Sequence, residues 1–85
     1  MRHIATDRFW KQFDVLPAEL QRSARQSYDL LKVNPHHPSL HFKKVGPYWS
    51  ARINKDYRAL AVETEKGMAW FWIGPHTGYE RLIRS

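Results

Sequence analysis

The sequence predicts an α+β domain, in which an N-terminal helical hairpin packs on one face of a three- to four-stranded antiparallel β-sheet. Three observations predict it. Apolar side chains recur at helical spacing up to residue 33, the spacing becomes that of strands from residue 40, and residues 69–73 form an unbroken apolar run. Such a run is typical of a strand buried on both faces of its sheet. The 85 residues make a single domain spanning 1–85.

The first half of the chain is expected to be helical. Residues 7–15 carry an amphipathic stripe and predict a short helix with Thr6 or Asp7 as its N-cap. Pro17 suits the first turn of a second helix, and a second apolar stripe runs over residues 17–33. Two helices joined at a proline, each with one apolar face, favour a hairpin that lies on a flat surface.

The second half of the chain is expected to form a meander of strands. The predicted strands are separated by turns rich in Gly, Pro, Asn or Asp and cover residues 40–45, 48–53, 57–63 and 68–73. Residues 1–5 add a short strand at most. Gly74-Pro75 is expected to end the last strand, because proline offers no N–H to a neighbouring strand. The residues after it are expected to form a functional loop held by a buried strand.

The pairing of the last two strands follows if Lys66-Gly67 is a two-residue loop. One face of the sheet then carries four apolar residues and suits the helices: Leu60, Val62, Phe71 and Ile73. Trp70 and Trp72 share the other face. There they are either partly exposed to a partner or packed under a loop or a chain end.

The pairing of the predicted strands decides on which face of the sheet Arg52 and Arg58 lie. Arg58 falls on the helix-facing side by parity, near a strand end. A three-residue loop over Asn54-Lys55-Asp56 places Arg52 opposite Arg58, whereas a two-residue loop does not. The sequence leaves both arrangements open.

The composition restricts the classes of function. The net charge is +6, and basic residues gather in the strand-rich half: Lys43, Lys44, Arg52, Lys55, Arg58, Arg81 and Arg84. This balance favours a polyanionic partner, either nucleic acid or an acidic protein segment. The absence of cysteine excludes disulfides and cysteine-based metal sites. The first residues lack the apolar region of a signal peptide, so a cytoplasmic location and no membrane partner are expected.

Three histidines gather in one predicted loop, at positions 36, 37 and 41. Imidazole is a common metal ligand, but no acidic or cysteine ligand lies nearby in the sequence. We therefore expect His36, His37 and His41 to be loop residues, and we expect no metal or cofactor.

Several segments together resemble the RelE/ParE superfamily of bacterial type II toxins, and the resemblance covers nearly the whole chain. They are Pro38-Ser39-Leu40-His41-Phe42-Lys43-Lys44, Tyr48-Trp49-Ser50-Ala51-Arg52-Ile53, Asp56-Tyr57-Arg58-Ala59-Leu60 and Trp72-Ile73-Gly74-Pro75-His76-Thr77-Gly78-Tyr79-Glu80-Arg81-Leu82. The resemblance implies a toxin neutralised by a cognate antitoxin. RelE-like members are endonucleases that cut mRNA in the ribosome, whereas ParE-like members bind DNA gyrase and do not cleave RNA.

RNA cleavage without a metal needs proton transfer and cations at the scissile phosphate. His76 is suited to transfer a proton, and Arg58 is suited to bind the phosphate with its guanidinium group. Tyr79 is suited to stack on a nucleobase or to donate a hydrogen bond to the phosphate. Three further basic residues are expected to add charge: Lys43, Lys44 and Arg52. The resemblance implies that an arginine matching Arg58 is often functional in RNA-cleaving members, and that a histidine or basic residue matching His76 sometimes is.

These residues also have purely structural interpretations. Arg58 would pair with Asp56 or Glu80, His76 would cap the final strand, and Tyr79 would be a core aromatic. The predicted strands carry no clear acidic residue that would serve as a base, which leaves the proton transfer to His76. The leading hypothesis is a ribosome-dependent mRNA endonuclease. The alternatives are a non-enzymatic toxin that binds gyrase, a relative that only binds its antitoxin, and a non-specific RNA-binding module.

Overall fold

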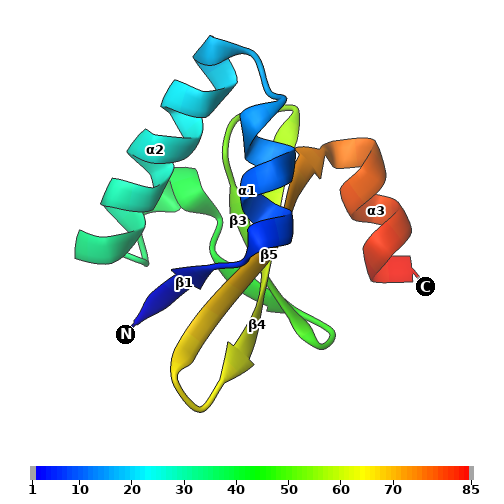
Figure 1. The fold of residues 1–85 in the computed structure, drawn as a ribbon. Coiled ribbons are helices and arrows are strands. Elements are labelled where there is room, and N and C mark those ends of the chain that lie inside the picture. The colour runs from blue at the N-terminus through cyan, green and yellow to red at the C-terminus, as the bar shows by residue number, and fades with distance from the viewer. Residues whose placement is uncertain (1, 85) are drawn as a thin grey trace.

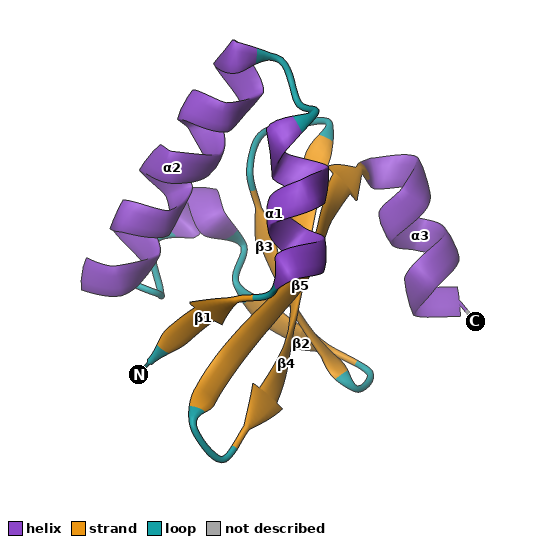
Figure 2. Cartoon of the chain, in the orientation of Figure 1, coloured by secondary structure: helices purple, strands orange, loops and turns teal. Residues whose placement is uncertain are grey.

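The computed structural model describes residues 2–84 as a five-stranded mixed sheet with helices packed on both faces (Figure 1). The elements are β1 (His3–Ala5), α1 (Asp7–Asp14), α2 (Ala18–Val33), the short 3-10 helix η1 (Pro38–Leu40), β2 (Lys43–Val45), β3 (Tyr48–Arg52), β4 (Tyr57–Thr64), β5 (Gly67–Pro75) and α3 (His76–Arg84). The strand order is β1-β5-β4-β3-β2 (Figure 2). No helix in residues 2–84 is long and apolar enough to cross a membrane.

The α1–α2 hairpin covers one face of the sheet, as predicted from its two apolar stripes. Thr6 is the N-cap of α1, and its Oγ1 accepts a hydrogen bond of 3.2 Å from the Phe9 backbone N–H. The larger core lies beneath this hairpin. It comprises Phe13, Ala24, Leu31, Leu40, Ala51, Ala59, Ala61, Met68, Trp70 and Ile73. The small alanines of β3 and β4 leave room for the large aromatic side chains of α1 and β5.

The C-terminal helix α3 was not predicted. It follows β5 directly and packs on the opposite face of the sheet from α1 and α2 (Figure 1). A second core of Leu60, Trp72 and Tyr79 lies beneath it. The expectation of a loop after Gly74-Pro75 was therefore wrong: Pro75 ends the strand, and the chain continues at once as a helix with its own apolar face.

The first strand makes the sheet mixed rather than antiparallel. Residues His3–Ala5 pair in parallel with β5, with Ile4 opposite Ala69. The other neighbouring strands are antiparallel. The prediction of three or four strands missed β1 as a full member of the sheet, because three residues are too few to show a period.

The register between β4 and β5 differs from the prediction. Thr64 lies opposite Gly67, so the turn is Glu65-Lys66 and not Lys66-Gly67. Ala61 then pairs with Trp70 while Leu60 pairs with Trp72, which leaves Phe71 as the extra residue of a β-bulge. The predicted face of Leu60, Val62, Phe71 and Ile73 was therefore wrong.

The bulge has a direct consequence for the two tryptophans. Side chains of a regular strand alternate between faces, and one extra residue reverses the alternation beyond it. Trp70 therefore packs against α1 and α2, and Trp72 packs under α3. Both are buried, at 6% and 8% exposure, so the expectation of a shared, partly exposed tryptophan face was wrong.

The turn between β3 and β4 takes the longer of the two predicted forms. Arg52 lies directly opposite Arg58, and the loop between the paired ends is Asn54-Lys55-Asp56. Arg58 shares the face of Leu60, which is the face of α3. The prediction that Arg58 faces the α1–α2 hairpin was therefore wrong, because it depended on the incorrect register of β5.

The start of β2 is later than expected. The predicted strand 40–45 is reduced to Lys43–Val45, and the chain before it turns through η1. Leu40 closes η1 and is 1% exposed, so it anchors this turn in the core.

The edge strand β1 holds one titratable group that makes stability depend on pH. Trp70 Nε1 donates a hydrogen bond of 3.0 Å to Nδ1 of His3. Burial, and to a smaller extent the charge of Lys32, lower the pKa of His3. Below the ordinary histidine pKa of about 6.5, the unfolded chain then binds a proton that the folded chain excludes. The free energy of unfolding therefore falls as the pH falls.

We expect the protein to lose less than about 1 kcal/mol between pH 7 and pH 5 through this group, because one hydrogen bond usually contributes about that much and solvent screens the partly exposed His3. Denaturant unfolding at the two pH values measures it. His3→Asn keeps an acceptor oxygen near the Nδ1 position but does not titrate, and it is expected to reduce the difference. The exposed His36 provides the control, since His36→Asn is expected to leave the difference unchanged. An equal pH dependence in His3→Asn and the wild type would contradict this account.

Candidate functional site

A polar cavity of about 120 Å³ lies on the α3 face of the sheet. Its lining comes from the segment before β2, from three adjacent strands and from α3, namely His41, Lys43, Ser50, Arg52, Arg58, His76 and Tyr79. Five of the six residues predicted from the sequence as a functional set are thus brought together: His76, Arg58, Tyr79, Lys43 and Arg52. We call this space the polar cavity.

The pairing of the strands explains why these residues meet. Directly paired residues share a face of the sheet. Lys43 pairs with Ser50, and Arg52 pairs with Arg58, so all four point to the α3 face. The unpredicted helix α3 then supplies His76 from its first residue and Tyr79 from its first turn.

Arg58 is held by the loop that precedes its own strand. Its Nη1 donates to the backbone oxygens of Asn54, at 2.7 Å, and Tyr57, at 2.9 Å. Burial and the facing charge of Arg52 lower the pKa of Arg58, although Tyr79 and Asp56 oppose this effect. Among the ion pairs of the described residues Arg58 has none, so the predicted pairing with Asp56 or Glu80 is replaced by these carbonyl contacts, which do not themselves neutralise the guanidinium charge.

His76 begins α3 and is fixed from two sides. Its backbone N–H donates to the oxygen of Asp56 at 2.7 Å, which ties the start of α3 to the β3–β4 loop. Its ring Nδ1 lies 3.3 Å from Oε1 of Glu80, one helical turn later. The ring of Tyr79 lies 5.6 Å from the ring of His76, centroid to centroid. Tyr79 is therefore both a core aromatic, as the structural interpretation had it, and part of the cavity wall.

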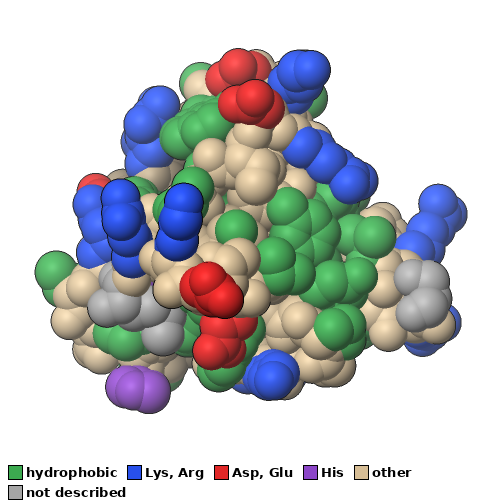
Figure 3. All heavy atoms as spheres, turned by 60° about the horizontal axis from the view of Figure 1, so that its bottom comes forward, with side chains coloured by type: hydrophobic (Ala, Val, Ile, Leu, Met, Phe, Trp, Pro, Cys, Tyr) green, Lys and Arg blue, Asp and Glu red, His purple; other side chains and the backbone are tan. Residues whose placement is uncertain are grey.

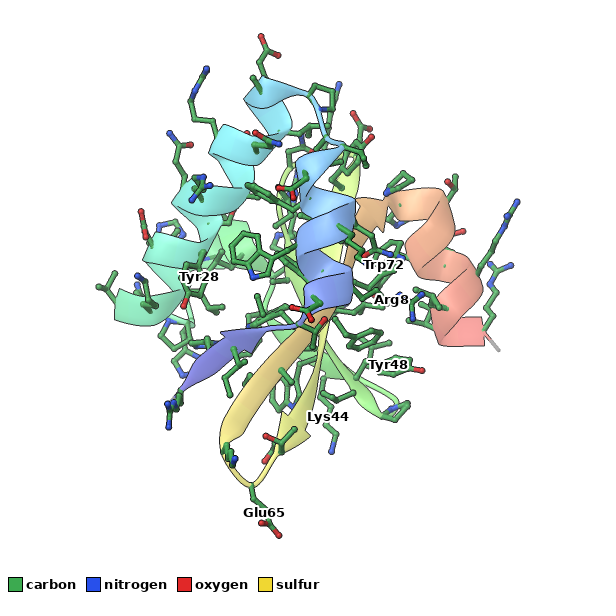
Figure 4. The ribbon with its side chains drawn as sticks, in the orientation of Figure 1. Arg8, Tyr28, Lys44, Tyr48, Glu65 and Trp72 are labelled. Carbon is green, nitrogen blue, oxygen red and sulfur yellow. The ribbon has the colours of Figure 1, made fainter. Side chains whose placement is uncertain are left out.

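Lys44 is the predicted site residue that does not line the polar cavity. It pairs with Trp49, and Trp49 packs with the core beneath the α1–α2 hairpin. Lys44 therefore belongs to the other face by alternation. Figure 4 shows its side chain at the lower end of the sheet, whereas α3 begins at the upper end. The sequence could not separate Lys43 from Lys44 without the register of β2.

Two residues of the polar cavity were not predicted as site residues, namely His41 and Ser50. Ser50 is 3% exposed and is the buried polar residue of β3. His41 was interpreted as a loop histidine, and it does lie in the loop between η1 and β2, where it also lines the polar cavity. His37 precedes η1, and its Nδ1 caps that helix by accepting from the Ser39 backbone N–H at 3.2 Å. The available signal for His41 was its position two residues before Lys43, on the same strand parity.

A second, larger cavity of about 230 Å³ lies between the α1–α2 hairpin and the sheet and is lined almost entirely by apolar side chains. Trp10 and Tyr28 open onto it and are about two-fifths exposed. It contains none of the predicted site residues. The exposed aromatic surface is thus carried by α1 and α2 and not by Trp70 and Trp72. Figure 3 shows hydrophobic side chains at the centre of one face of the molecule, with Lys and Arg side chains around them.

The chemistry open to the polar cavity follows from its residue types. Lys43, Arg52 and Arg58 supply positive charge for a phosphate. The imidazole rings of His41 and His76 are of the residue type that most often transfers protons in catalysis. Directly opposed like charges such as Arg52 and Arg58 destabilise a sheet, and a bound anion relieves that repulsion. The cavity therefore suits a phosphate ester whose reaction requires proton transfer.

The chain was compared with protein families and with solved structures, and both comparisons found similar proteins. Residues 18–81 match the family model described as a ParE-like toxin domain. Among solved structures, the RelB-RelE antitoxin-toxin complex from Methanococcus jannaschii aligns with a TM-score of 0.71 at 11% identity, covering 93% of this chain and 96% of that chain. The YoeB/ParE toxin from Agrobacterium tumefaciens aligns at 0.68 and 16% identity, covering 89% and 99%.

YafQ from E. coli aligns with a TM-score of 0.66 at 16% identity, covering 92% of this chain and 96% of that chain. No curated protein matches the sequence significantly. At such low identities the structural matches show a common fold. They confirm the predicted RelE/ParE-like α+β architecture.

Proposed function

This chain belongs to the family of ParE-like toxin domains, and on that premise we propose that it is the toxin of a type II toxin–antitoxin system that cleaves mRNA on the ribosome. The observation that carries the proposal is the polar cavity. Three basic side chains, two imidazoles and a phenol meet there within one small space. A surface that only binds another protein does not require this concentration of phosphate-binding and proton-transferring groups.

The proposed reaction needs no metal. The 2′-oxygen of one nucleotide attacks the adjacent phosphorus while its proton passes to a base in the cavity. The bond from phosphorus to the 5′-oxygen breaks, and that oxygen receives a proton. The products are a 2′,3′-cyclic phosphate and a 5′-hydroxyl end. Arg58 and Arg52 stabilise the negative charge that develops on the phosphate oxygens. His76 supplies one of the two proton transfers.

The proposed partners are a cognate antitoxin protein and the ribosome with its mRNA. The M. jannaschii RelE was solved in complex with RelB, its antitoxin. A net charge of +6 suits both an acidic antitoxin segment and ribosomal RNA. The site of action is proposed to be the cytoplasm, where translation occurs.

Induced expression in a bacterial host tests the proposal, with growth and newly formed mRNA 5′ ends as readouts. We expect the wild type to arrest growth and to create new ends, and we expect His76→Ala and Arg58→Ala to abolish both effects. His36→Ala is the matched control, since His36 is exposed and lies outside the polar cavity. Co-expression of a candidate antitoxin is expected to restore growth.

The other outcomes identify the alternatives. Growth arrest without new mRNA ends would contradict RNA cleavage and favour the gyrase binding that the resemblance to ParE-like members implies. A supercoiling assay with purified gyrase would then test it. No arrest, with soluble protein present, would favour a relative that only binds its antitoxin. RNA binding that collapses with salt and yields no cleavage would favour a non-specific RNA-binding module.

A further inference from the structure

We propose that His41 is a second catalytic residue of the polar cavity and acts as the general acid that protonates the leaving 5′-oxygen, while His76 acts as the general base. This inference rests on the proposed RNA cleavage. Such a reaction needs two proton transfers, and the described part of the cavity wall contains no carboxylate. His41 and His76 are the two imidazoles that line it.

The backbone before β2 is built to hold His41 in place. His41 follows η1 and has a left-handed backbone conformation, with φ 43° and ψ 41°. In residues 2–84 it is the one non-glycine residue with a positive φ. Such a conformation costs of order 1 kcal/mol; it is common where a helix ends, as η1 does here, and it also recurs at active sites. The fully buried Leu40 immediately before it fixes the turn in the core.

The contacts of the two histidines assign their roles. A carboxylate oxygen of Glu80 lies 3.3 Å from Nδ1 of His76, which favours the hydrogen on Nδ1 and leaves Nε2 free to accept a proton. This is the arrangement of a general base oriented by a carboxylate. His41 comes from the opposite wall, on the side of Lys43, and has no ion pair with a carboxylate among the described contacts.

The proton balance is complete with these two groups. Nε2 of His76 takes the proton of the 2′-hydroxyl as the 2′-oxygen bonds to phosphorus. The imidazolium of His41 gives its proton to the 5′-oxygen as the bond from phosphorus to that oxygen breaks. His76 ends protonated and His41 ends neutral, so solvent exchange restores both. Arg52 and Arg58 lie between them on the strands and face the phosphate.

The test uses full-length protein with ribosomes carrying a defined mRNA, and it measures single-turnover cleavage. His41→Asn removes the proton donor but suits the left-handed backbone, because asparagine adopts it readily. We expect cleavage to slow by about 100- to 10,000-fold, the usual contribution of one acid or base, with the melting temperature preserved. His36→Asn, in the same loop but outside the cavity, is the control and is expected to cleave as the wild type does.

A second substrate identifies the role of each histidine. Replacing the bridging 5′-oxygen with sulfur gives a leaving group that departs without a proton. We expect this substrate to restore His41→Asn to within about tenfold of the wild type, while His76→Asn stays slow. Full activity of His41→Asn on the oxygen substrate would overturn the inference, and so would rescue of His76→Asn in place of His41→Asn. A wild type that cuts neither substrate would overturn the proposed function itself.

Discussion

Replacing Arg58 with lysine is expected to slow mRNA cleavage by about 100- to 1,000-fold, although the charge is kept. Nη1 of Arg58 already donates to the backbone oxygens of Asn54 and Tyr57, so the rest of the planar guanidinium is directed by these two contacts. A lysine ammonium cannot hold both carbonyls and also present a rigid fork to a phosphate. The loss corresponds to that of one preorganised donor at the developing charge.

Single-turnover cleavage on programmed ribosomes measures this effect, and Arg84→Lys is the matched control. Arg84 is exposed near the end of α3 and does not line the polar cavity. Removing one of two opposed arginines also relieves repulsion in the sheet, so Arg58→Gln is expected to be folded while cleaving poorly. Wild-type cleavage rates in Arg58→Lys would show that Arg58 is not the phosphate clamp.

Replacing Trp72 with alanine is expected to destabilise the protein by about 3–5 kcal/mol, a large part of the stability of so small a domain. The indole lies between β5 and α3 (Figure 4) and packs on two glycines. A Cβ on Gly74 would lie 2.6 Å from Cζ2 of Trp72, and one on Gly78 would lie 3.0 Å from the same atom. The indole ring therefore fills the space between the end of β5 and the first turn of α3.

Denaturant unfolding measures the change, and Trp10→Ala provides the comparison. Trp10 is 43% exposed, so its removal is expected to cost far less. Trp72→Ala is also expected to abolish RNA cleavage, because the positions of His76 and Tyr79 depend on the packing of α3 against Trp72. A change in unfolding free energy of less than about 1 kcal/mol would contradict the role of Trp72 in fixing α3.

The elements that the sequence predicted well are those with long apolar periods. The stripes of α1 and α2 place both helices within two residues of their observed ends. The run through β5 identifies a buried interior strand, which lies between β1 and the central strand β4. These patterns are local and repeat over several turns or residues, so tertiary contacts do not override them.

The wrong predictions concern short features of the backbone: a one-residue bulge, the junction between β5 and α3, and a three-residue strand. The bulge at Phe71 reverses which face each later side chain takes, and no sequence pattern marks it. It places Trp72 under α3, whereas Arg58 takes the face of the polar cavity by regular alternation with Leu60 along β4. The helix α3 begins directly after Pro75, where a loop was expected. The short strand β1 is in the sheet because it pairs in parallel with β5; its three residues are too few to show the alternation of a strand in the sequence.

The candidate site was predicted by residue type rather than by geometry. His76, Arg58, Tyr79, Arg52 and Lys43 were selected for their chemistry, and the sheet brings all five to one cavity. Lys44 was selected for its charge and lies on the opposite face. His41 was grouped with His36 and His37 as a loop residue, because no acidic or cysteine ligand lies nearby in the sequence. Its place in the cavity depends on η1 and on a left-handed backbone, neither of which the sequence indicated.

The most direct test of RNA cleavage by the polar cavity uses purified wild-type protein, a defined mRNA, and ribosomes either stalled on that mRNA or left out. Primer extension maps the 5′ ends, and end-group analysis identifies the 3′ product. We expect discrete cuts within ribosome-occupied codons that end in a 2′,3′-cyclic phosphate, and no cuts without ribosomes. Intact mRNA on occupied ribosomes, with the protein folded, would contradict the proposal that this toxin is an mRNA endonuclease.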